Sequence, residues 1–171
     1  MKIVRNTLYL KPGKTTADLI DAVVERVREL NIASVVVAST RGRSALMVAE
    51  ALEGIAKVIS VTEFTYDGDV KKRMRRRGIT AVERADLPIQ DRCGMREALL
   101  LFGEGVKAAL EVAAIAAERG LETCKVIAVA GSRGGLDTAL VVRPAPPSAF
   151  SSPDPEKRMA VLEVIAMPLR E

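Results

Sequence analysis

The stretch Val35–Thr62, VVVASTRGRSALMVAEALEGIAKVISVT, decides the fold because it holds a complete strand–loop–helix–strand unit. Its two ends are runs of Val and Ile, and such runs are typical of strands covered on both faces of a parallel sheet. Between them, residues 46–52 carry apolar side chains at helical spacing. Strands that alternate with helices in this way predict an α/β protein.

The rest of the chain repeats the pattern. Further strands are predicted over 3–10, 79–83, 125–130, 138–143 and 161–167, and helices over 70–77 and 95–119. Another helix should begin with a capping box formed by Thr15 and Asp18. The link between strands 125–130 and 138–143 is too short for a parallel crossover, so this pair should be antiparallel. We expect one domain, residues 1–171, in a three-layer α/β/α sandwich.

Composition excludes several kinds of chemistry. The 171 residues include no His, which removes Ser-His-Asp and Cys-His nucleophile systems and every His-containing metal site. Two cysteines cannot form a Cys-only zinc site. The carboxylates near strand ends, Glu63, Asp67, Asp69, Glu83 and Asp137, show no spacing that singles out an acid/base pair. We therefore predict no catalytic and no metal-binding residue, although an enzyme is left open.

The surroundings of the protein can also be inferred. No apolar run approaches the ~20 residues that span a bilayer, and no secretory signal follows Met1, so we expect a cytoplasmic protein with free thiols and no membrane partner. Only three side-chain amides are present (Asn6, Asn31 and Gln90), and Arg, Lys and Glu are abundant. This composition favours a thermophilic source.

The segment 39–44 has the composition of a phosphate-binding loop. It follows a buried strand and opens a helix, whose free N–H groups and dipole favour an anion. The predicted binding residues are Ser39, Thr40, Arg41, Gly42, Arg43 and Ser44, which supply hydroxyls and positive charge. Gly42 is expected to allow close approach of the backbone to the ligand. The alternative is a capped helix start with solvated arginines.

A second loop follows the predicted strand 125–130. Its candidate binding residues are Gly131, Ser132, Arg133, Gly134, Gly135 and Thr138. A glycine-rich hairpin alone would be unremarkable, so the pairing of the two loops carries the prediction. Lys11 is a further candidate for the ligand, in a strand–turn–helix junction that lacks the first glycine of a P-loop.

A run of six positive charges lies between Lys71 and Arg77. A solvated helix face explains it, and cations near a helix C-terminus are favourable. The aromatic side chains that would stack single-stranded bases are absent. This argues against nucleic acid as a partner, although an RNA-associated protein that uses the helix at 71–77 stays an alternative.

Residues 108–117 predict self-association. This part of the long helix is apolar nearly all round, and Glu111 is its only charge. One face should pack on the sheet, and a second subunit is expected to cover the other. The competing explanation is that the chain's own terminal segments cover this helix.

The stretch Val35–Thr62 resembles the C-terminal domain of pyruvate kinase, in which a buried strand leads into an effector loop. Thr40, Gly42, Ser44, Ala45 and Thr62 occupy the matching positions. Stand-alone archaeal proteins of this type are similar over nearly the whole chain. The shared motifs here are Lys11-Pro12-Gly13, Leu101-Phe102-Gly103-Glu104-Gly105-Val106-Lys107 and Asp137-Thr138-Ala139-Leu140-Val141-Val142-Arg143-Pro144-Ala145.

The resemblance implies a strand order 3-2-1-4-5 for 33–38, 57–62, 79–83, 125–130 and 138–143, with an antiparallel edge strand. It adds Thr62 to the site at the carboxyl ends of the strands, and it implies flavin mononucleotide (FMN) as the cofactor. The family has segments that contain His after the strands that end at Thr62 and Glu83, whereas residues 63–68 and 84–87 at these places contain no His. We expect a binding protein for a phosphorylated small molecule, without pyruvate kinase activity because the catalytic barrel needs about 250 residues. A flavin-dependent enzyme is the alternative.

Overall fold

The computed structural model describes residues 1–11, 13, 15–132 and 134–171. Its elements are β1 (Leu8–Leu10), α1 (Thr16–Leu30), β2 (Ser34–Ala38), α2 (Arg43–Ala51), β3 (Lys57–Val61), α3 (Gly68–Arg76), β4 (Thr80–Val82), α4 (Cys93–Leu100), α5 (Glu104–Glu118), β5 (Val126–Ala130), β6 (Thr138–Arg143), the 3-10 helix η1 (Pro147–Ala149) and β7 (Ala160–Pro168). The part of the chain that is described contains no helix long and apolar enough to cross a membrane.

One mixed sheet forms the middle layer, with the strand order β1-β7-β6-β5-β2-β3-β4. Five neighbouring strands, β4-β3-β2-β5-β6, have the predicted order. β5 and β6 are antiparallel, as expected. The sheet does not end at β6, however, because β7 pairs with β6 and β1 pairs with β7. β6 is therefore an internal strand and not the predicted edge strand.

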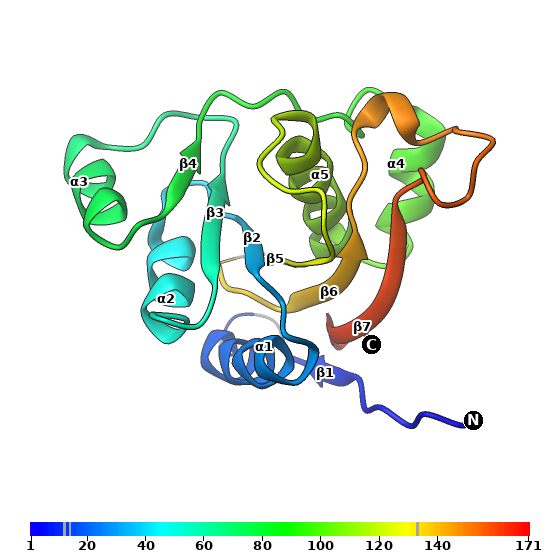
Figure 1. Ribbon diagram of the computed structural model, residues 1–171, viewed down its shortest axis with the longest axis horizontal. Helices are drawn as coiled ribbons and strands as arrows, with labels where there is room; N and C mark the ends of the chain where they lie inside the picture. The colour runs from blue at the N-terminus through cyan, green and yellow to red at the C-terminus, as the bar shows by residue number, and fades with distance from the viewer. Residues whose placement is uncertain (12, 14, 133) are drawn as a thin grey trace.

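Helices cover both faces of this sheet (Figure 1). Val35 and Val37 of β2 pack in one core with α1 and α2, whereas Val36 packs with α5 in a second core. Successive side chains of a strand point to opposite faces, which is why an unbroken apolar run is needed here. The fold is the three-layer α/β/α sandwich that the sequence predicts.

Two predicted elements are wrong in length. The strand predicted over 3–10 is limited to β1, and Ile3 and Val4 are exposed because no neighbouring strand covers them. The helix predicted over 95–119 is divided into α4 and α5. Gly103 separates them with φ 110° and ψ 158°, a backbone conformation that only glycine adopts readily.

The capping box at α1 is also wrong. Thr15 is the N-cap residue, but its side chain makes no capping hydrogen bond. Its Oγ1 donates instead to the backbone oxygen of Lys11, at 3.1 Å.

The predicted oligomer surface is buried inside the chain. Every residue from Ala109 to Ala116 is buried in the single subunit. Met95 and Leu99 of α4, together with Phe150 and Met167 near the C-terminus, pack into the same core as α5. The chain itself covers the helix, so 108–117 is not an intersubunit surface. Self-association stays a prediction, now without an assigned surface.

Candidate functional site

The candidate site lies where four parallel strands end. β2 pairs in parallel with β3 and β5, and β3 pairs in parallel with β4, so their carboxyl ends share one edge of the sheet. The residues that follow these ends include Ser39, Thr62, Glu83 and Gly131. Ligands of open α/β sheets bind at this edge.

Hydrogen bonds fix the loop after β2. The Ser39 backbone N–H donates to the oxygen of Val61 at 3.1 Å, and Ser39 Oγ accepts from the N–H of Ala45 in the first turn of α2 at 3.4 Å. The N–H groups of Arg43 and Ser44 at the start of α2 have no partner within the helix. They are available to an anion at the positive end of the helix dipole.

Gly42 lies at the contact between α2 and α3. It is buried, with φ 85°, as the N-cap of α2. A Cβ atom built on it would lie 2.6 Å from both Met74 Cε and Val70 Cγ1 of α3. Gly42 therefore allows α3 to approach α2, and its predicted contact with a ligand stays a prediction.

Asp137 organises the loop after β5. This buried carboxylate accepts hydrogen bonds from the backbone N–H and the hydroxyl of Ser132 and from Thr138 Oγ1. Both donors of Ser132 are thus already used. A Cβ on Gly131 would overlap the backbone oxygen of Gly135, so this turn requires glycine.

The two loops line one cavity of about 380 Å³, which we call the loop cavity. Its lining includes most of the predicted residues, namely Ser39, Thr40, Arg41, Arg43, Ser44, Gly131, Ser132, Gly134 and Gly135. Exposed Lys11 and buried Gly42 and Thr138 do not line it. The candidate Arg133 lies outside the described residues.

A second cavity, of about 260 Å³, adjoins the loop cavity, and we call it the inner cavity. The two share the lining residues Ala38, Ser39, Thr40 and Gly131. Thr62 lines the inner cavity, and its Oγ1 donates to the oxygen of Thr40 at 3.1 Å. Apolar side chains make up much of the remaining wall, including Phe64, Leu87, Ala108 and Val112.

An ion pair on α5 also lines the inner cavity. Lys107 Nζ lies 2.9 Å from Glu111 Oε1 and donates to Gln90 Oε1 at 2.9 Å. Glu111 is only 1% exposed. Burial raises the pKa of this carboxyl, the Lys107 ammonium opposes the rise, and the charge of Glu63 adds to it. A carboxyl with a raised pKa in a cavity is a candidate proton donor or acceptor.

The hydroxyl of Tyr66 makes buried hydrogen bonds to Ser39 and Ser60 beside the site. It donates to the backbone oxygen of Ser39 at 2.9 Å and lies 2.7 Å from Ser60 Oγ. Burial raises the pKa of Tyr66 to about 12, and the charge of Glu83 adds to the rise while the bond with Ser60 opposes it.

Glu83 connects Tyr66 to Lys71 of α3. It accepts from the backbone N–H of Tyr66 at 2.6 Å and pairs with Lys71 at 3.1 Å. Desolvation acts to raise the pKa of Glu83, but the Tyr66 N–H and the Lys71 charge outweigh it and lower the pKa.

The sequence interpretation missed Lys107, Glu111 and Tyr66 as site residues. Glu111 carried a signal, because it is the only charge in an apolar half-helix, but that signal was assigned to an oligomer surface. Both cysteines are free and exposed, as expected. Among the described residues, no cluster of three or more His, Cys, Asp or Glu side chains is arranged to hold a metal ion.

Among solved structures, a pyruvate kinase chain is a distant structural neighbour of this protein. No protein-family model matches the chain. A Cryptosporidium parvum pyruvate kinase, solved in complex with ADP, is similar with a TM-score of 0.44 and 14% sequence identity. The match covers 93% of this chain but only 25% of that pyruvate kinase chain. The present chain thus spans about a quarter of that chain's length, and at this TM-score the similarity carries no inference about function.

Proposed function

We propose that the protein binds a phosphorylated small molecule, with FMN as the leading candidate, across the loop cavity and the inner cavity. The observation that carries the proposal is the shared wall of these two cavities at the carboxyl ends of β2 and β5. One cavity offers donors for an anion, and the other offers apolar side chains. FMN combines these two chemistries in one molecule.

The phosphate group is expected in the loop cavity. Ser44 Oγ, the N–H groups that begin α2, and the guanidinium groups of Arg41 and Arg43 supply donors and positive charge. Ser132 contributes less than the sequence suggested, since Asp137 occupies both of its donors. These groups suit a phosphate monoester.

The isoalloxazine ring is expected in the inner cavity. Phe64, Leu87 and Val112 provide apolar contacts there, while Lys107 and Glu111 provide polar groups at its edge. Such a mixture is typical of cofactor sites. The segments 63–68 and 84–87, which contain no His, supply Phe64 and Leu87 to this lining.

A flavin-dependent enzyme is the second candidate function, and the pair Lys107–Glu111 favours it. Glu111 is buried, lines the cavity and has a raised pKa, as proton-transferring carboxyls often do. Oxidation of reduced nicotinamide by the flavin-loaded protein, lost in Glu111→Gln, would support this alternative.

The test compares FMN with riboflavin, which lacks the phosphate, by titration calorimetry on the full chain. We expect FMN to bind at least about tenfold more tightly, and Ser44→Ala to remove most of this advantage. Ser151→Ala, at an exposed serine outside both cavities, is the matched control. Equal affinities for the two ligands would contradict the phosphate role, and no binding of either would contradict the flavin.

A further inference from the structure

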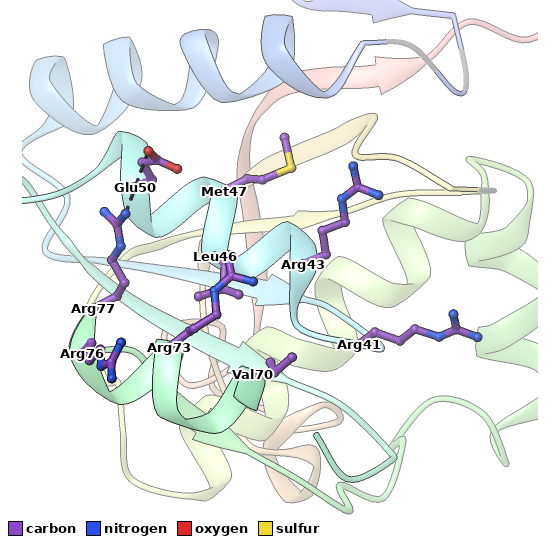
Figure 2. Close-up of a pocket in the computed structure, with 9 residues that line it drawn as sticks. All are labelled: Arg41, Arg43, Leu46, Met47, Glu50, Val70, Arg73, Arg76 and Arg77. Carbon is purple, nitrogen blue, oxygen red and sulfur yellow. Dashed lines mark ion pairs between the residues drawn. The ribbon is translucent and has the colours of Figure 1, made fainter. Parts of the chain in front are cut away.

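A large groove lies between α2 and α3, beside the loop cavity (Figure 2). Its volume is about 710 Å³. Five arginines line it together with one carboxylate and three apolar side chains: Arg41, Arg43, Arg73, Arg76, Arg77, Glu50, Leu46, Met47 and Val70. We call it the arginine groove. The proposed function does not use it, apart from Arg41 and Arg43, which line both spaces.

Helical spacing brings these side chains to one place. On α2, Arg43, Met47 and Glu50 recur every three or four residues and therefore share a face. On α3, Val70, Arg73 and Arg77 do the same. In the view of Figure 2, Arg73 lies at the middle of the groove, between the arginines at the end of α3 and those at the start of α2.

Most of this positive charge is not neutralised by the protein. Arg77 pairs with Glu50 at 3.9 Å and with Glu53 at 3.4 Å. Within the described part of the chain, no carboxylate oxygen lies within 4.0 Å of the other four guanidinium groups. Because the guanidinium groups that line this groove carry the same charge and repel one another, the arrangement favours an anionic ligand.

Helix stability explains the arginines of α3 but not the position of Arg43. Arginines in the last turn of α3 are favourable with the helix dipole. Arg43 is at the opposite kind of position, the first residue of α2, where a cation is unfavourable, and the first turn of α2 has no acidic residue. Arg43 thus places positive charge against the dipole at a position that lines both the arginine groove and the loop cavity.

We propose that the arginine groove binds a small molecule that carries several linked phosphate groups. Four arginines without a carboxylate partner line the groove, and a guanidinium group can pair with a phosphate in a bidentate manner. The volume lies in the range of small-molecule sites. None of the described residues that line the groove is aromatic, so they provide no stacking surface of the kind found in a single-strand nucleic-acid site.

The test measures binding of inorganic tripolyphosphate to the full chain by titration calorimetry. Arg73→Ala with Arg76→Ala removes two charges from the groove. Lys72→Ala with Arg75→Ala removes two charges from exposed positions of the same helix that do not line it. We expect the groove variant to lose at least about tenfold in affinity and the control variant less than about twofold. Urea unfolding establishes that both variants are folded.

Equal losses in the two variants would overturn the proposal, because they would indicate diffuse charge attraction. Absence of tripolyphosphate binding to the unmodified chain would overturn it as well. So would a 12-residue oligouridylate that binds more tightly than tripolyphosphate and depends on Arg73 and Arg76. Ser44→Ala keeps the groove intact and should leave tripolyphosphate affinity unchanged, whereas a loss would assign tripolyphosphate to the loop cavity and overturn the proposal. The result with FMN is independent of all these outcomes.

Discussion

Glu111 makes stability depend on pH. Its raised pKa means that the folded chain binds a proton more readily than the unfolded chain does. This favourable contribution is fully present below the unfolded pKa of Glu, and it is lost as the pH rises through the folded pKa. Once ionised, the buried carboxylate costs stability, so the contribution of Glu111 falls as the pH rises.

We predict that Glu111→Gln gains stability relative to the unmodified chain as the pH rises from 4 to 7. The difference in Tm between the two proteins should grow by a few degrees across this range, measured by thermal unfolding. Glu118→Gln, at an exposed position of the same helix, should show no such trend. The same pH dependence in both variants would contradict the assignment to Glu111.

Tyr66 is predicted to stabilise the fold through its hydroxyl. Tyr66→Phe removes the donor to the Ser39 oxygen and the bond with Ser60, both of which are buried. An unsatisfied buried group costs about 1–3 kcal/mol, so we expect a loss of this size in the free energy of unfolding. Tyr9→Phe, at an exposed residue, should change it by less than about 0.5 kcal/mol. Urea denaturation measures both, and equal effects would reject the role of Tyr66.

Among the elements, the spacing of α2 and α3 is predicted to depend on Gly42. Gly42→Ala would place a Cβ atom 2.6 Å from side chains of Met74 and Val70, and it also requires a positive φ. Gly78→Ala at the end of α3 has the same backbone requirement, with φ 69°, but meets no atom within 4 Å.

The comparison of these two variants separates packing from backbone strain. We expect Gly42→Ala to be less stable than Gly78→Ala by about 1 kcal/mol or more, the order of an overpacked contact. It should also weaken tripolyphosphate binding, because the arginines of α3 move relative to those of α2. Equal stabilities in urea would show that α3 adapts without cost.

At the scale of the molecule, the central strands were predictable because their physics is local. Residues 35–37 are apolar without a break, and only a strand between two helical layers buries them all. The break at Gly103 was harder to predict. Gly103 and Gly105 indicate a bend because glycine is a poor helix former, but Leu99, Phe102 and Val106 continue the helical period across it.

The candidate site was likewise predictable only in part. Ser39 and Gly131 directly follow buried strands, so the sequence indicates both loops. Tyr66 and Lys107 contact residues that are distant in the sequence, Ser39 and Gln90. No local sequence pattern predicts these contacts. FMN binding and self-association stay predictions.

The pairing of β1 with β7 joins the two ends of the chain, Leu8 opposite Ala166. During synthesis, β2 to β5 can assemble while later residues are still being added. Among the described residues, β1 pairs with β7 alone, so this contact can form only after residues 160–168 have been made. Its three residues extend one edge of the sheet through a contact between segments far apart in sequence, and such contacts are expected to form slowly.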